Sequence, residues 1–177
     1  MVIISNLRTL AQTREEFDNL IFYIPQGLSV SKTTNSMILT DVTTGNGQKF
    51  TITVNKPVVS FKKMEKSFPK YWRELLIQEG YDNPPEEPPF IKFQNNAGWI
   101  CSRGGKLVKY SGQSTPAWYH LTIMRYLGIT VQVVTKSDTE ELFIQKLSLL
   151  MQLVISVELK NRSYQNNQGP ATSSLLP

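Results

Sequence analysis

The sequence predicts an α+β domain: one compact unit with a mostly antiparallel sheet and three to four helices packed on it. Segments in which apolar and polar residues alternate, separated by Gly, Asn and Pro, indicate antiparallel strands. Other segments place apolar residues at helical spacing. Hydrophobic residues make up 40% of the 177 residues, enough for a core. We therefore expect a single domain over residues 1–160 and a disordered polar tail over 161–177.

The first helix is expected near the N-terminus, in "TREEFDNLIFYI". Thr13 and Glu16 form a capping box, and Phe17, Leu20 and Ile24 follow at helical spacing. A β-hairpin should come next, because "MILTDV" and "QKFTITV" flank the turn sequence "TTGNG" around Asn46-Gly47.

A second helix is predicted after Ser67, which we expect to be its N-cap, with Pro69 tolerated in the first turn. Trp72 and Leu75 fall on its apolar side, and Gly80 should end it. The segment that follows, "YDNPPEEPPF", is rich in proline and acidic residues, which predicts an extended, exposed loop.

The second half of the chain should add strands at "FIKFQ" and "GWICSRGGKLVKY", with Gly104-Gly105 as a hairpin turn. "TPAWYHLTIMRYLG" is expected to form a short helix starting near Thr115-Pro116, and "ITVQVV" a strand. Ser137 and Glu140 form a second capping box, ahead of the strongest helical pattern in the sequence. "ISVEL" is a candidate final strand.

The residues typical of enzyme active sites are sparse. His120 is the single histidine and Cys101 the single cysteine, so the sequence cannot form a disulfide within the chain or a Cys/His metal cluster. No phosphate-binding loop or nucleophile elbow matches. We therefore expect a noncatalytic protein without cofactor or metal, although an enzyme of unfamiliar type with a site near His120 stays open.

The distribution of charge says more about function than the motifs do. The chain carries a net charge of +5 and has no Asp or Glu between Pro88 and Ser137. A cationic surface of this kind attracts a polyanion, either acidic lipid or nucleic acid. The solvent-exposed side of an ordinary helix would carry the same lysines without binding either. The predicted membrane- or nucleic-acid-binding residues are Lys56, Lys62, Lys63, Lys66, Lys70, Arg73, Arg103, Lys106 and Lys109, the last three as a patch on a hairpin. Glu86 and Glu87 are the predicted self-association residues, because an acidic loop can meet a basic patch on a neighbouring copy.

The segment "KFTITVNKPVVSFKKMEKSFPKYW" resembles the small matrix proteins of plant-infecting rhabdoviruses, in its order of alternating strand, basic turn and Trp-bearing helix. The following "PPFIKFQ" resembles the next strand of that family. The resemblance implies a structural protein that self-associates, binds viral nucleoprotein–RNA and bridges it to an anionic membrane during assembly and budding. It also implies a peripheral location at the inner face of the virion envelope and on host endomembranes or in the cytoplasm.

The sequence differs from that family at its N-terminus and in the motif used for budding. The N-terminus has no lysine cluster, and "NPPEEPPF" lacks the Tyr of a PPxY motif. The alternative function is a nonspecific RNA- or DNA-binding accessory protein, such as a viral silencing suppressor or movement factor, whose binding would depend strongly on salt.

Overall fold

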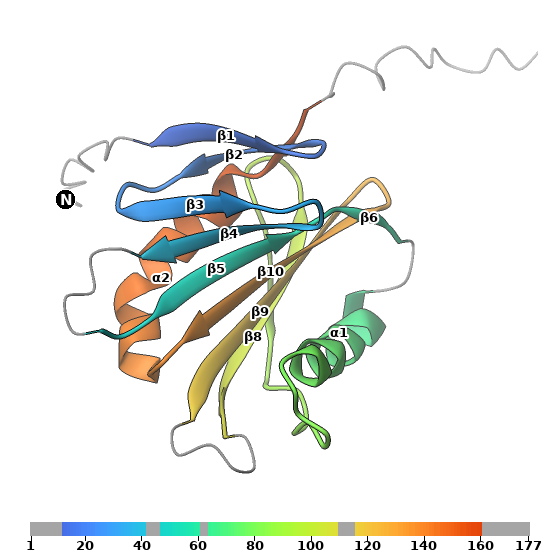
Figure 1. The fold of residues 1–177 in the computed structure, drawn as a ribbon. Coiled ribbons are helices and arrows are strands. Elements are labelled where there is room, and N and C mark those ends of the chain that lie inside the picture. Colours follow the sequence, from blue (N-terminus) through green and yellow to red (C-terminus); the bar gives the residue numbers. More distant parts are fainter. Residues whose placement is uncertain (1–11, 42–46, 61–63, 110–115, 161–177) are drawn as a thin grey trace, which may run out of the picture.

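The structure is a computed structural model that describes residues 12–41, 47–60, 64–109 and 116–160, with only the backbone described for 64–66. The described residues form two antiparallel sheets and two helices (Figure 1). The smaller sheet contains β1 Thr13–Phe17, β2 Leu20–Ile24 and β11 Glu158–Leu159. The larger sheet contains β3 Leu28–Lys32, β4 Ser36–Asp41, β5 Phe50–Asn55, β6 Val58–Val59, β7 Ile91–Gln94, β8 Ile100–Val108, β9 Ala117–Tyr126 and β10 Ile129–Ser137. The helices are α1 Met64–Gln78 and α2 Glu140–Ser156.

The strand order of the larger sheet is β3-β4-β5-β10-β9-β8-β7, with β6 also paired to β10. Neighbours along the chain form hairpins, and one long-range pairing joins the two halves: β5 lies antiparallel to β10, with Val54 opposite Val133. This pairing places the short strand β6 beside the start of β10, where Val59 is opposite Ile129.

A helix covers part of each face of the larger sheet. On one face, α2 packs over β5, β9 and β10, and its Leu150, Leu153 and Val154 are fully buried in the main core. On the other face, α1 packs over β9 and contributes Phe68 and Trp72 to a second core (Figure 1). Because strand side chains alternate between the two faces, β8 to β10 supply residues to both cores.

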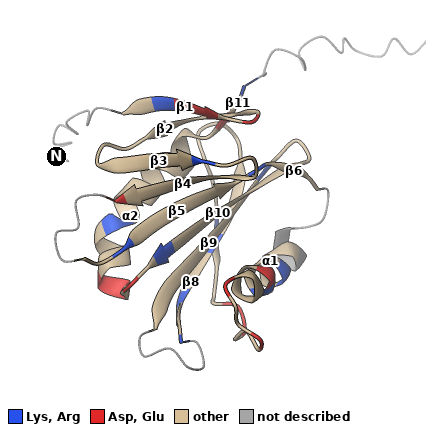
Figure 2. Cartoon of the chain, viewed as in Figure 1, with Lys and Arg blue, Asp and Glu red and all other residues tan. Residues whose placement is uncertain are grey.

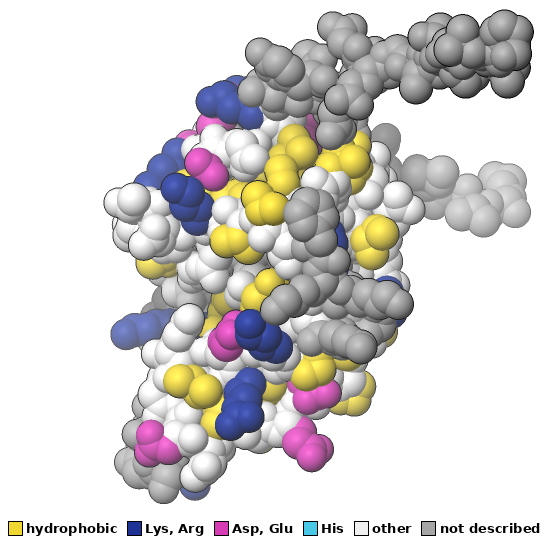
Figure 3. All heavy atoms as spheres, turned by 90° about the vertical axis from the view of Figure 1, so that its right-hand side faces the viewer, with side chains coloured by type: hydrophobic (Ala, Val, Ile, Leu, Met, Phe, Trp, Pro, Cys, Tyr) yellow, Lys and Arg dark blue, Asp and Glu magenta, His cyan; other side chains and the backbone are white. Residues whose placement is uncertain are grey.

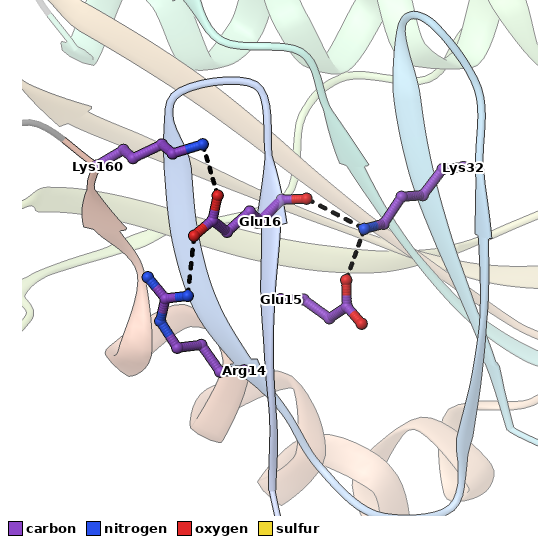
Figure 4. A network of polar contacts seen from close by, with 5 residues as sticks. All are labelled: Arg14, Glu15, Glu16, Lys32 and Lys160. Atoms are coloured by element: carbon purple, nitrogen blue, oxygen red, sulfur yellow. Dashed lines mark hydrogen bonds and ion pairs between the residues drawn. The ribbon is translucent and has the colours of Figure 1, made fainter.

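Lys32 of the larger sheet contacts the smaller sheet, where Glu16 forms two further ion pairs (Figure 4). Lys32 of β3 contacts the Glu15 carboxylate of β1 at 2.6 Å and the backbone oxygen of Glu16 at 3.1 Å. The Glu16 carboxylate pairs with Lys160 at 2.5 Å and with Arg14 at 2.8 Å. The bond from Lys160 holds the pKa of Glu16 below its ordinary value.

The prediction of three to four helices is wrong, because the described residues contain two. The segment expected as the first helix is the hairpin β1–β2, in which Phe17 pairs with Leu20 across the turn residues 18–19. Asp18 adopts a positive φ of 54°, a conformation that Asp and Asn tolerate in tight turns. Thr13 is therefore a strand residue and not a helix cap.

The segment expected as a short helix near Thr115-Pro116 is also extended. It forms strand β9, which returns through the turn Leu127-Gly128, both with positive φ, into β10. Gly104 and Gly105 are not a hairpin turn either, because they lie inside the continuous strand β8. The chain reverses between β8 and β9 instead, in a segment that includes residues outside the described ranges.

Other sequence predictions are confirmed. β4 and β5 form the expected hairpin, although Asn46 lies outside the described residues, and β10 and β11 are strands. The helices predicted after Ser67 and after Ser137 are both present, as α1 and α2. However, α1 begins at Met64, so Ser67 lies inside it, and the N-cap of α2 is Thr139, whose hydroxyl accepts from Leu142 N. The predicted tail, 161–177, lies outside the described residues.

Candidate functional site

Exposed hydrophobic side chains gather at the end of the sheet where β9 turns into β10. Val58, Val59 and Leu127 are exposed by 47%, 76% and 54%, and Ile100 by 54%. Register places Val58 beside Thr130, Thr130 beside Arg125 and Arg125 beside Ile100, so these residues form one row across four strands. We call Val58, Val59, Ile100 and Leu127 the hydrophobic tip. Val59 is opposite Ile129 and therefore points to the other face of the sheet from Val58, and Thr130 and Arg125 separate Val58 from Ile100. The tip is thus a set of exposed apolar side chains at one end of the sheet, a feature that marks some interaction sites.

Helix α1 follows the tip in the chain and lies on the same side of the sheet. Ser60 N donates to Gly128 O at 2.7 Å, which fixes the chain beside the β9–β10 turn just before α1 begins. Arg125 sits between the two elements: its Nε donates to Thr130 Oγ1 at 3.2 Å and its Nη2 to Ser67 Oγ of α1 at 3.4 Å. These contacts set the position of the helix relative to the tip.

The cations predicted in this region are partly described. Lys56, Lys70 and Arg73 are exposed, Lys66 belongs to α1, and Lys62 and Lys63 lie outside the described residues. Figure 2 shows cationic and acidic residues together on α1. Figure 3, which faces this side, shows hydrophobic side chains in both halves, interspersed with Lys, Arg, Asp and Glu side chains. Val58 and Ile100 therefore lie on the face of the sheet on which α1 packs, whereas Val59 points to the other face.

A groove of about 620 Å³ lies between α1 and the proline-rich loop. Lys70 and Arg73 line it from the helix, and Glu86 and Glu87 line it from the loop. The indole Nε1 of Trp72 donates to Pro85 O at 3.2 Å, which holds the loop against the helix. The structure therefore places the predicted self-association acids opposite predicted basic residues of the same chain. Their contact with a neighbouring copy stays a prediction.

The three cations predicted as a hairpin patch are not brought together. Arg103 lies in the middle of β8 on the face covered by α2, where it is partly buried and its Nη1 contacts Met151 Sδ at 3.2 Å. Lys106 points to the opposite face, one strand from Tyr119, and Lys109 follows the end of β8. Both lysines are exposed. The hairpin patch is wrong as a single surface because alternate strand residues face opposite sides.

The two residues with reactive side chains are buried. His120 is 4% exposed and stacks on Phe143 of α2, with ring centroids 4.9 Å apart. Burial, with a smaller contribution from the Arg103 charge, lowers the pKa of His120 to about 3, so the ring is neutral at physiological pH. Burial raises the pKa of Cys101 to about 12, which keeps it a thiol. Within the described ranges, no group of three or more His, Cys, Asp or Glu residues is placed to hold a metal ion.

Comparisons with known proteins concern the fold. No protein-family model matches the sequence, and no curated protein matches it. The solved structure of the Ran-binding protein Mog1p from Saccharomyces cerevisiae is similar, with a TM-score of 0.58 at 8% identity over 86% of this chain and 97% of that chain. The cyanobacterial PsbP protein of Synechocystis sp. PCC 6803 is similar with a TM-score of 0.57 at 11% identity, over 86% and 95%. At such identities the likeness shows the fold alone.

The hydrophobic tip was not predicted from the sequence. In the sequence, Val58 and Val59 follow a predicted strand, and Leu127 falls in a segment predicted as a helix. The usable signal was the pair Leu127-Gly128 between two β-rich segments, which marks a hairpin turn with an exposed leucine. No helix among the described residues has the length and apolar content to span a membrane.

Proposed function

We propose that this protein is a noncatalytic, matrix-like assembly protein that binds an anionic membrane surface peripherally through the hydrophobic tip and α1. The proposal rests on the exposed apolar side chains of the tip together with the exposed cations Lys56, Lys70 and Arg73, which belong to the segment around β6 and to the helix that follows it. Self-association and the bridging of a viral nucleoprotein–RNA to the envelope belong to the proposal through the sequence resemblance.

Stable membrane attachment needs both the cationic and the apolar side chains. A cation near an acidic bilayer contributes about 1 kcal/mol, so three described cations contribute about 3 kcal/mol, or roughly two powers of ten in affinity. That is weak for stable attachment. Exposed Val and Leu side chains that enter the interface add hydrophobic burial, as in other peripheral proteins with mixed basic and apolar faces.

The nucleic-acid alternative has less support from this face. Proteins that bind single-stranded nucleic acid stack bases on accessible aromatic rings. Phe68 and Trp72 of α1 are 0% and 1% exposed, and Trp99 is fully buried. The exposed residues of the tip are aliphatic, which suits lipid better than bases. Mog1p, which shares the fold, is a Ran-binding protein, but at 8% identity this likeness supplies no binding residue here.

The test is flotation of the purified protein with vesicles of phosphatidylglycerol and phosphatidylcholine, compared with vesicles of phosphatidylcholine alone. We expect flotation with the acidic vesicles only. Val59→Asp should abolish it, because Val59 is 76% exposed and a carboxylate there opposes both burial and attraction to acidic lipid. The double variant Lys70→Glu/Arg73→Glu should weaken flotation strongly and make the remainder insensitive to salt.

Matched controls lie elsewhere on the molecule. Ile144→Asp changes a 60% exposed side chain on α2, and Lys49→Glu changes an exposed cation at the start of β5. Both should float like the wild type. Equal flotation with neutral vesicles, or equal losses from the control variants, would contradict the proposed face. Salt-sensitive RNA binding that needs Lys70 and Arg73, without flotation, would favour the nucleic-acid function.

A further inference from the structure

The groove between α1 and the proline-rich loop presents opposite charges on its two walls. Lys70 and Arg73 stand on the helix wall, and Glu86 and Glu87 on the loop wall. Among the described residues, Arg73, Glu86 and Glu87 make no ion pair, and Lys70 contacts Glu74 of its own helix at 3.4 Å. The charges facing this groove therefore do not neutralise one another across it.

The walls are held in place by buried contacts. Besides the bond from Trp72 to Pro85, the Phe68 ring of α1 stacks on Phe90 of the loop, with centroids 4.4 Å apart. Gly104 of β8 allows this approach, since a Cβ there would lie 2.7 Å from Pro89 O and 3.3 Å from Phe68. A groove with fixed walls can bind a ligand without the entropic cost of ordering the loop.

We propose that this groove binds the headgroup of an aminophospholipid, with its phosphate toward Lys70 and Arg73 and its ammonium toward Glu86 and Glu87. The volume of about 620 Å³ falls in the range of small-molecule sites. A ligand with one charge would leave one wall unpaired, whereas a headgroup with phosphate and ammonium pairs with both. Phosphatidylserine adds a carboxylate next to the ammonium, which gives the net negative charge that the cationic face attracts and which must point away from Glu86 and Glu87 for the ammonium to pair with them.

This inference rests on the proposed function but makes a separate prediction about lipid choice. Simple attraction between a cationic face and a bilayer depends on net charge, so phosphatidylserine and phosphatidylglycerol should bind alike. Pairing of the ammonium with Glu86 or Glu87 adds a charge-assisted contact that phosphatidylglycerol cannot make. A contact of that kind is worth about tenfold in affinity.

The experiment compares binding to vesicles with equal fractions of phosphatidylserine or phosphatidylglycerol. The wild type should bind phosphatidylserine about tenfold more tightly. The double variant Glu86→Gln/Glu87→Gln should lose this preference and yet bind phosphatidylglycerol at least as well, because it removes negative charge from the cationic face. Both side chains are exposed, so thermal unfolding should not change. As a control, Glu140→Gln/Glu141→Gln, at the exposed start of α2, should keep the preference.

A soluble probe separates this inference from the membrane function. Glycerophosphoserine should shift the amide resonances of α1 and of the loop, and glycerophosphate should do so about tenfold more weakly. Flotation with equal affinity for the two acidic lipids would overturn the inference and leave the membrane function standing. Binding of glycerophosphoserine without any flotation would overturn the membrane function and leave the headgroup site standing. No response to the probe and no preference between lipids would overturn the inference outright.

Discussion

The two faces of the larger sheet differ in how completely they are covered. On the α2 face, the helix lies over β5, β9 and β10, and the strand residues there, such as Leu39, Ile52 and Val133, are fully buried. On the α1 face, the helix packs mainly over β9 (Figure 1). The alternate residues of β4 and β5 on this face, such as Ile38 and Thr53, stay partly exposed.

This difference indicates a division of roles. The α2 face holds the larger core and also the buried His120 and Cys101, so its residues serve stability. The α1 face is incomplete, and the exposed apolar tip, the exposed Lys70 and Arg73 of α1 and the charged groove all lie on it or at its margin. Substitutions on the α2 face should therefore act mainly on folding, and substitutions on the exposed part of the α1 face mainly on binding.

The largest expected effect comes from the centre of the α2 core. Leu150→Ala removes a side chain that is 0% exposed and leaves a cavity, which should lower the free energy of unfolding by about 2–5 kcal/mol. Ile144→Ala, on the same helix but 60% exposed, should change it by about 0.5 kcal/mol or less. Urea unfolding of both variants measures the difference. Similar losses would mean that the exposed side of α2 is buried by something further.

A smaller effect should distinguish the two neighbouring glycines of β8, one of which faces each side of the sheet. A Cβ on Gly104 would lie 2.7 Å from the backbone oxygen of Pro89, which has little freedom to move. A Cβ on Gly105 would meet His120, Trp118 and the Tyr119 oxygen at 3.0–3.1 Å. We expect Gly104→Ala to cost about 1–3 kcal/mol and Gly105→Ala less.

The glycine pair also gives a readout on the groove. Because Gly104 lies under Pro89 and Phe90, Gly104→Ala should displace the loop and reduce the preference for phosphatidylserine, whereas Gly105→Ala should leave it intact. Thermal unfolding and the vesicle comparison can be run on the same samples. A loss of preference from Gly105→Ala, or none from Gly104→Ala, would show that the loop position does not control the groove.

Much of the sheet could be predicted from alternation, but the hairpin β1–β2 and the strand β9 were mistaken for helices. In β1–β2, Phe17 and Leu20 flank a two-residue turn, and Leu20 and Ile24 lie on one face of a strand. The resulting spacing of three and four residues equals that of a helix. Asp18-Asn19 carried the information that separates the two, because these residue types accept the left-handed backbone that a tight turn needs.

The candidate site also has parts that the sequence predicts and parts that it does not. The basic side of α1 was visible in the sequence, because its lysines and aromatics are close together along the chain. The hydrophobic tip depends on the pairing of β6 with β10, and the groove depends on how the loop packs on α1. Arg103 and Lys106 show the opposite failure, since residues close in sequence lie on different faces of β8. Long-range packing, which local patterns do not contain, decides the tip and the groove, whereas the cation patch failed because Gly104-Gly105 lies inside a strand and not in a turn.

The smallest expected effect is a pH dependence that belongs to the α2 face alone. His120 is neutral in the folded protein because burial lowers its pKa to about 3, whereas in the unfolded chain its pKa returns to about 6.5. Unfolding therefore takes up a proton below pH 6.5, and stability, complete above that value, should fall by about 1 kcal/mol per pH unit as the pH drops. Between pH 6.5 and 5.5 most carboxylates, including the Glu16 pair, stay ionised and contribute little. His120→Phe keeps a ring against Phe143 and should flatten urea-unfolding free energies across this window, whatever its effect at pH 7.5. An unchanged slope in this variant would place the proton uptake elsewhere, and would mean that the α2 face is open enough for water to reach the imidazole.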